Sequence, residues 1–342
     1  SEHVESQSIP DSSNPPYRGS DYLWKGTLVY EGKVYDHIRF RARGGGWRDS
    51  MGKNMWKFDF NRGHRFEARD DYGKKYNAAW SKLNFSALIQ QGNFRQRGEQ
   101  GLFEGAGFKN HNLSDNPAPK THNVHFRIVE HADENGPTSS QYDTDFQGLY
   151  MAIEQLDGQF LDEHDLPDGY LWKIEGNNNQ NPPNNQGPYL ESSLPNGDVD
   201  DFIAGYRGGS PTADWWKSKL DLDDYYSFRA NATWVHDYDI HAGKNYFFLH
   251  NPETDQWRVV NWDLDLTWTT TYGGGGPRGP LSDDVLGIPE FALGYRNRVR
   301  DLQDLLHNSE QQGMLLDEVA HWVSTPGQPS MVDADRAMWD YN

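Results

Sequence analysis

The sequence contains no cysteine, which excludes disulfide bonds and thiolate metal sites. It also lacks an apolar run of the roughly 18 residues that a membrane-spanning helix needs. Basic residues are scarce, because 32 Lys and Arg stand against 51 Asp and Glu, for a formal net charge of −19. Such a field repels nucleic acids and anionic membranes and favours metal ions, cationic proteins or small ligands as partners.

Aromatic residues compensate for a modest apolar content of 35%, since Trp, Tyr and Phe make up 14% of the chain. Large rings can fill much of a hydrophobic core. A chain of 342 residues is long enough for one large domain or for two lobes around a cleft. Residues 1–16, SEHVESQSIPDSSNPP, predict a flexible arm typical of a mature exported protein whose leader is removed. We therefore expect an extracellular or cell-surface location.

The first half of the chain is rich in strand signals. GTLVYEGKVYDHIRFRARG predicts a hairpin that turns at Glu31–Gly32. Residues 54–60 alternate aromatic and polar side chains, which is typical of a strand with one buried face. Further strands are expected at 123–130 and 147–154, and a mostly helical segment at 79–106.

The second half of the chain predicts more helix. Residues 176–198 are rich in Asn, Pro and Gly and predict a long surface loop. The elements expected after it are a helix at 222–234 capped by Asp221, strands at 246–250 and 257–262, and helices at 289–307 and 311–323. Strands followed by helices predict a two-lobed α+β domain, with a strand-rich N-lobe over 17–156 and a C-lobe over 157–342.

The most informative segment is HDYDIHAGKNYFFLHNPETDQWRVVNWDLDLTW. Its polar turn NPETDQ lies between two β-like runs and predicts an antiparallel hairpin. If His250 pairs with Trp257, then Asn245 lies opposite Trp262, and Lys244 faces Asp263. The hairpin's open end would then carry Asn245 and Asp263 together.

Asp239, Asn245 and Asp263 supply two carboxylates and an amide oxygen near this open end. Such hard oxygen ligands suit Mg²⁺ or Mn²⁺, with Ca²⁺ as a further candidate. A metal that bridges nucleotide phosphates needs few protein ligands. Asp265 is either another ligand or a salt-bridge partner. Asp and Asn are also ordinary residues of turns, which is the alternative interpretation.

KNYFFLHNPETDQWRVVNWDLDLTW resembles the hallmark of the CotH kinase family: an Asn-aromatic-aromatic strand, a turn, and a strand ending in W-D-x-D. IRFRARGGGWRDSMGKNMWKFDF, FQGLYMAIEQLDGQFL and GYLWKIEG are similar to further segments of that family, in the same order. The resemblance covers roughly residues 35–342. It implies a divergent protein kinase-like fold that transfers phosphate from ATP to Ser or Thr of partner proteins.

The resemblance also implies roles for single residues. Asp239 would orient the accepting hydroxyl, with Asp237 as the alternative. Asp263 would be the principal metal ligand, and Asn245 the second one.

For the lysine that contacts phosphate, Lys57 and Lys53 both qualify. Gly45, within the run Gly44–Gly46, could let backbone N–H groups approach phosphates, and Arg43 could assist. The alternatives are a plain turn and a solvent-exposed strand face.

Glu154 ends an apolar strand, and Lys173 lies in the segment LWKIE. Both could contact the nucleotide, and an ordinary ion pair between strands is the competing interpretation. An acidic kinase is expected to favour basic or Ser-rich protein substrates.

Two other functions compete with the kinase. One is a non-catalytic cell-surface binding or adhesion module on the same fold. The other is a glycoside-acting enzyme, which the abundant Trp and acidic residues would suit, but which needs two carboxylates flanking a sugar bond.

Overall fold

The structure is a computed structural model. It describes residues 23–44, 53–88, 102–129, 145–174, 185–188, 197–240, 244–268 and 279–339. Strands and helices both contribute, so the fold class is α+β, as predicted. None of the helices in these ranges is long and apolar enough to cross a membrane.

The chain divides into two compact units. The first consists of Ser1–Leu102, Thr121–Gln155 and Glu318–Asn342, and the second of Phe103–Lys120 and Leu156–Asp317. Each unit is therefore built from separate segments of the chain. Phe103–Lys120 belongs to the second unit although it lies between two segments of the first, and Glu318–Asn342 at the end of the chain belongs to the first unit. The expected lobes over 17–156 and 157–342 stay a prediction.

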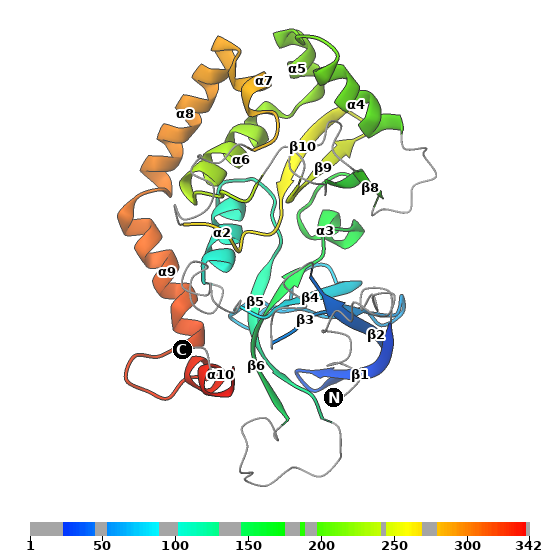
Figure 1. Ribbon diagram of the computed structural model, residues 1–342, viewed down its shortest axis with the longest axis vertical. Coiled ribbons are helices and arrows are strands. Elements are labelled where there is room, and N and C mark those ends of the chain that lie inside the picture. Colours follow the sequence, from blue (N-terminus) through cyan, green and yellow to red (C-terminus); the bar gives the residue numbers. More distant parts are fainter. Residues whose placement is uncertain are drawn as a thin grey trace, which may run out of the picture. The chain divides into compact units, whose positions relative to one another are not determined.

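The first unit is built on a six-stranded antiparallel sheet with the order β1-β2-β3-β4-β6-β5 (Figure 1). Its strands are β1 Trp24–Tyr30, β2 Lys33–Arg43, β3 Met55–Asp59, β4 Lys82–Ser86, β5 Thr121–Arg127 and β6 Phe146–Glu154. The predicted hairpin turns at Glu31 and Gly32, both at positive φ (49° and 75°), as a tight hairpin requires. Helix α10 (Met331–Trp339) packs against β6.

Aromatic rings fill the core of this unit. Phe58 meets Phe85 edge-on at 5.1 Å between ring centroids, and Phe85 meets Phe126 at 5.2 Å. Phe126 continues the series to Tyr150 at 5.3 Å. Edge-to-face contacts of this kind add to the stabilisation that ring burial provides. Aromatic rings therefore fill core volume that aliphatic side chains fill in other proteins.

The helix expected over 79–106 is wrong for its first part. Residues Lys82–Ser86 form strand β4, with Leu83 and Phe85 in the core and Asn84 on the other face. This short alternation has a period of two, which is the periodicity of a strand. Helix α2 begins only at Leu102 and ends at Leu113, while 89–101 lie outside the described residues.

The second unit contains a four-stranded sheet with the order β10-β9-β7-β8. Its strands are β7 Tyr170–Ile174, β8 Asn185–Pro188, β9 Tyr246–Asn251 and β10 Gln256–Asn261. Its helices are α2, α3 Gly158–Glu163, α4 Gly197–Arg207, α5 Ala213–Lys219, α6 Leu222–Trp234, α7 Ser282–Leu286 and α8 Pro289–Leu305. Helix α9, Ser309–Val323, begins in this unit and ends in the first, because the division falls after Asp317. The loop expected over 176–198 is wrong where β8 pairs with β7. A four-residue strand in a Pro- and Asn-rich segment carries no periodic signal.

Helix α6 confirms its predicted bounds and its predicted cap. The side chain of Asp221 accepts a hydrogen bond from the backbone N–H of Asp224 at 3.2 Å, which satisfies one of the free donors of the first turn. The helix packs against α8 and β10 (Figure 1). It therefore connects the helices of this unit to the hairpin.

The β9–β10 hairpin has the predicted register. His250 pairs with Trp257, and the N–H of Trp262 donates to the carbonyl of Asn245 at 3.3 Å. The polar turn fixes the register because each strand presents alternating faces.

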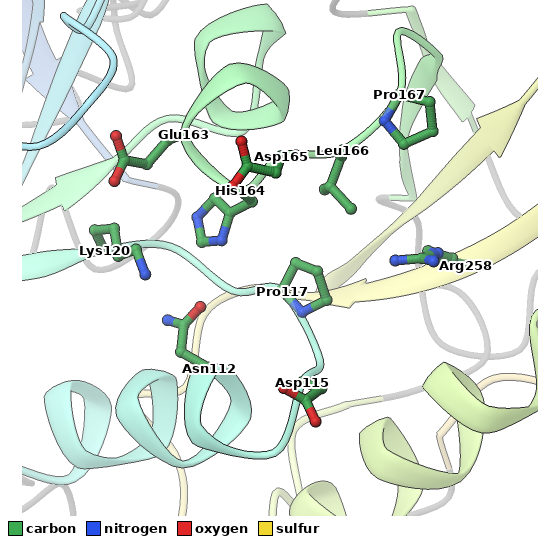
Figure 2. A pocket seen from close by; sticks show the side chains of 10 residues that line it. All are labelled: Asn112, Asp115, Pro117, Lys120, Glu163, His164, Asp165, Leu166, Pro167 and Arg258. Atoms are coloured by element: carbon green, nitrogen blue, oxygen red, sulfur yellow. The ribbon is translucent and has the colours of Figure 1, made fainter.

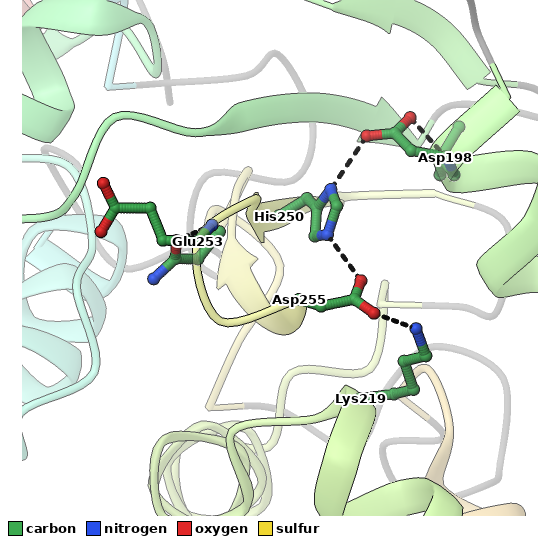
Figure 3. A network of polar contacts seen from close by, with 7 residues as sticks. Asp198, Lys219, His250, Glu253 and Asp255 are labelled. Atoms are coloured by element: carbon green, nitrogen blue, oxygen red, sulfur yellow. Dashed lines mark hydrogen bonds and ion pairs between the residues drawn. The ribbon is translucent and has the colours of Figure 1, made fainter.

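A polar network holds the closed end of the hairpin (Figure 3). The His250 ring lies between Asp198 on α4, 3.0 Å from Nδ1, and Asp255 in the turn, 3.1 Å from Nε2. Asp255 also pairs with Lys219 of α5, and the His250 ring stacks on Trp257 at 4.3 Å. These contacts connect the hairpin to α4 and α5.

Candidate functional site

The open end of the hairpin carries two residues with left-handed backbones. Asn245 has φ 66° and Asp263 has φ 65°, and each lies just beyond the end of a strand. Asn and Asp are the non-glycine residues that adopt this conformation most readily. The sequence thus supplies residues suited both to the backbone at this point and to oxygen chemistry.

Asp239 is held by two side chains. Lys244 Nζ lies 2.8 Å from Oδ1, and Asn245 Nδ2 lies 2.8 Å from Oδ2 and 3.2 Å from the Asp239 carbonyl. Lys244 therefore forms its ion pair with Asp239; the register alone predicted that it would face Asp263. The amide nitrogen of Asn245 donates to Asp239. The side-chain oxygen of Asn245 is therefore the atom that can bind a ligand.

Asp237 contacts the last residue of β10 and is buried, with 1% of its surface exposed. Asn261 donates to its Oδ2 at 3.3 Å. Burial, reinforced by the charges of Asp239 and Asp263, raises the pKa of Asp237 to about 7. The charges of Asp239 and Asp263 therefore both disfavour the ionised form of Asp237, and a divalent cation bound beside it would oppose that effect.

A buried hydrogen-bonded chain continues from Asn261. Its amide lies 3.2 Å from His111 Nε2, and His111 Nδ1 lies 2.6 Å from Asn116 Oδ1. Asn116 Nδ2 then donates to Asp224 Oδ1 at 3.1 Å. Burial lowers the pKa of His111 to about 4, so the ring is neutral at pH 7 and accepts at Nε2 while donating from Nδ1. The sequence analysis missed this chain, because its members are far apart in sequence.

Asp265 lies in the turn that follows β10, and β10 ends at Asn261. Strand alternation therefore does not extend from Asp263 to Asp265. Its role as a further ligand stays a prediction.

In the first unit, Lys57 lies on the polar face of the sheet, opposite Arg41 of β2 and Asn84 of β4. Its Nζ donates to Gln155 Oε1 at 2.9 Å. Burial, together with the positive charges of Lys82 and Arg41, lowers the pKa of Lys57 to about 7. Several positive charges held on one partly buried face are an environment that favours an anion.

Lys53, the other lysine considered for phosphate, is 1% exposed. Its ammonium group pairs with Asp335 at 2.7 Å and donates to the carbonyls of Ala87 and Leu149. These contacts use the three donors of an ammonium group, and burial lowers its pKa to about 8. The geometry therefore favours Lys57 as the lysine available to a ligand.

The remaining candidate residues are spread over both units. Arg43 is half-buried at the end of β2, and its charge also lowers the pKa of Lys57. Gly45 lies outside the described residues. Lys173 is on β7 of the second unit, opposite Phe247.

Glu154 is 1% exposed and pairs with Leu83, a residue of the aromatic core. Residues directly opposite in an antiparallel pair share a face of the sheet. Glu154 therefore lies on the face opposite to Lys57, which pairs with Asn84.

A family model described as CotH kinase protein matches residues 40–312. Because this match covers most of the chain, the chain belongs to the CotH kinase family. No curated protein matches it.

Metal chemistry at this site depends on few protein ligands. Across the described ranges, no three His, Cys, Asp or Glu side chains are grouped so as to hold a metal ion. Asp263 and the side-chain oxygen of Asn245 would form a smaller set of hard ligands, to which nucleotide phosphates would add the rest. The donor types fit Mg²⁺ or Mn²⁺.

Proposed function

We propose that this chain catalyses ATP- and divalent-metal-dependent transfer of phosphate to Ser or Thr of partner proteins. The proposal rests on one observation above all. The Asn245 amide binds Asp239, and Asn245 and Asp263 both lie just beyond the last paired residues of one hairpin. Family membership supports kinase-like chemistry of this kind.

Asp263 is the proposed principal metal ligand, and Asn245 is the second through its side-chain oxygen. The metal, Mg²⁺ or Mn²⁺, would neutralise charge on the transferred phosphate. The left-handed backbones at both residues support this role, since they place two oxygen-bearing side chains where the ladder of the hairpin ends.

The hydroxyl-orienting acid is Asp239 or Asp237. Accessibility favours Asp239, whose side chain is 21% exposed. The raised pKa of about 7 favours Asp237, because an acid–base group works best near the operating pH. Asp239→Asn and Asp237→Asn distinguish them: the variant of the orienting residue loses transfer while it still binds Mn²⁺ and ATP.

Lys57 is the proposed phosphate contact of the first unit, assisted by Arg41 and Arg43. A lysine with a lowered pKa gains affinity for its proton when an anion binds beside it. Lys57 now donates to the neutral side chain of Gln155. We propose that it donates to a phosphate oxygen instead when the nucleotide binds.

The proposed acceptors are basic or Ser-rich segments of proteins, encountered outside the cell. The net charge of −19 supports basic partners, because it attracts cations. Equal labelling of Ser peptides with and without Lys and Arg would contradict this preference.

Thermal unfolding with ATP and Mn²⁺ tests the proposal most simply. We expect the two together to raise the melting temperature, and neither Asp263→Ala nor Lys57→Met to show the full rise. The absence of any shift in the wild type would favour a non-catalytic adhesion module on the same fold.

A further inference from the structure

An acidic cavity of about 600 Å³ lies within the second unit, where α6 and α8 contribute to its wall. Five of the residues that line it are aspartates, drawn from separate segments: Asp115, Asp221, Asp223, Asp224 and Asp301. The residues proposed for the metal and for the accepting hydroxyl are not part of this lining.

Two arginines also line the cavity, and each is bonded within the protein. Arg258 Nη2 lies 2.8 Å from Asp221 Oδ2. Arg298 donates from Nε to Ser227 Oγ at 2.9 Å and from Nη2 to the Ser114 carbonyl at 2.8 Å. Five aspartates against two arginines leave the lining of the cavity with an excess of acidic groups.

Asp224 gives a second, independent indication of a ligand. It is 6% exposed, and its Oδ1 accepts from Asn116. Its other oxygen, Oδ2, has no hydrogen-bond partner among the residues that the structure describes. Buried carboxylate oxygens are normally satisfied, so this one lacks a donor that a ligand in the cavity could provide.

A neighbouring hollow of about 400 Å³ differs in charge (Figure 2). It shares Asp115 and Arg258 with the acidic cavity, but Lys120 and His164 also line it. Its lining has three carboxylates, Asp115, Glu163 and Asp165, against the two cations Lys120 and Arg258. Its excess of carboxylates is therefore smaller than that of the acidic cavity, where five aspartates stand against two arginines.

We propose that the acidic cavity binds an organic cation through an ammonium or guanidinium group that donates to Asp224 Oδ2. Asp115, Asp223 and Asp301, all exposed, hold its charge. A bare metal ion fits less well, because in the described part of the chain no three acidic or imidazole side chains converge on one point. Ammonium and guanidinium groups need no such convergence, since their donors spread over a larger frame. The group belongs either to a free polyamine or to a basic side chain of a peptide.

Isothermal titration calorimetry of the full chain at pH 8 and low salt tests this proposal, with spermidine and a blocked tetra-arginine peptide as the two probes. The cavity variant is D115N/D223N/D301N. Its matched control is D168N/D283N/D317N, three exposed aspartates of the same unit that do not line the cavity. Both variants lose the same net charge, so the general field of the protein changes equally. Asp224→Asn is the third variant.

We expect at least one probe to bind at a single site in the wild type. The cavity variant and Asp224→Asn should weaken that binding by about tenfold or more, and the matched control by less than about twofold. Binding of spermidine alone identifies a polyamine as the source, and binding of the peptide alone a basic side chain. Equal losses in the cavity variant and its control, or no binding of either probe, would overturn the proposal. Neither result depends on phosphoryl transfer, so the proposed kinase function is tested separately.

Discussion

The side-chain amide of Asn245 donates to Oδ2 of Asp239 across 2.8 Å. This contact determines which atom of Asn245 is left for a ligand, namely its oxygen. It also links the last residue before β9 to the carboxylate that Lys244 neutralises.

Asn245→Asp replaces the donor of this contact with a second carboxylate. Without metal we expect a loss of roughly 1–3 kcal/mol in the free energy of unfolding, because a charged hydrogen bond becomes a repulsion. Saturating Mn²⁺ should restore more stability in this variant than in the wild type. Urea unfolding with EDTA and with Mn²⁺ measures both.

Asn251→Asp is the matched control, at the closed end of the same hairpin. Its side-chain oxygen accepts from the Glu253 N–H, and an aspartate keeps that bond. We expect little change in its metal response. Equal behaviour of the two variants would show that the Asn245 contact has no special link to metal.

Lys57 predicts a pH dependence of nucleotide affinity. Its pKa of about 7 means that the ammonium form is lost as the pH rises above 7, and a phosphate binds that form. Affinity for ATP should fall between pH 7 and 9 by up to about tenfold per pH unit. Lys57→Arg should flatten this profile, because a guanidinium stays charged.

Lys82→Gln provides a directional control for this profile. The charge of Lys82 lowers the pKa of Lys57, so its removal should move the fall in affinity to higher pH. An unchanged slope in Lys57→Arg would assign the pH dependence to another group.

The buried ion pair Lys53–Asp335 should matter far more for stability than an exposed pair of similar length. Lys53→Met leaves Asp335 charged and buried, which costs about 3–5 kcal/mol. Lys217→Met breaks the Lys217–Glu290 pair, 2.8 Å long and about half exposed, at a cost below about 1 kcal/mol. Chemical denaturation compares the two, and equal losses would contradict a structural role for Lys53.

The buried carboxyl group of Asp224 should make the free energy of unfolding fall as the pH rises. Burial raises its pKa from 3.8 to about 7, so the native state retains a proton that the unfolded chain releases. The stabilisation is complete below pH 3.8 and is lost as the pH rises through 7. Relative to Asp224→Asn, the wild type should lose up to about 1.4 kcal/mol per pH unit over this range. An equal pH dependence in the wild type and Asp224→Asn would contradict this assignment.

Local patterns predicted the elements that local forces determine. The β9–β10 register followed from a polar turn between alternating strands, and α6 from a run that begins at a capping aspartate. Strand β4 was missed because Leu83 and Phe85 give an alternation too short to separate from a helix.

The candidate site could be located from the sequence, but its contacts could not. The pairing of Lys244 with Asp239 depends on how the chain runs before the strand. The chain through His111 and Asn116 joins a helix end to β10, residues that only the tertiary fold brings together. No sequence period encodes such contacts.

The central claim is that Asp263 and its neighbours hold a divalent cation that carries ATP. Its most direct measurement is incubation of the wild type and Asp263→Ala with γ-labelled ATP and Mn²⁺, with circular dichroism to verify that both are folded. We predict label on Ser or Thr with the wild type and none with the variant, self-labelling included. Transfer that persists in the folded variant would contradict the account.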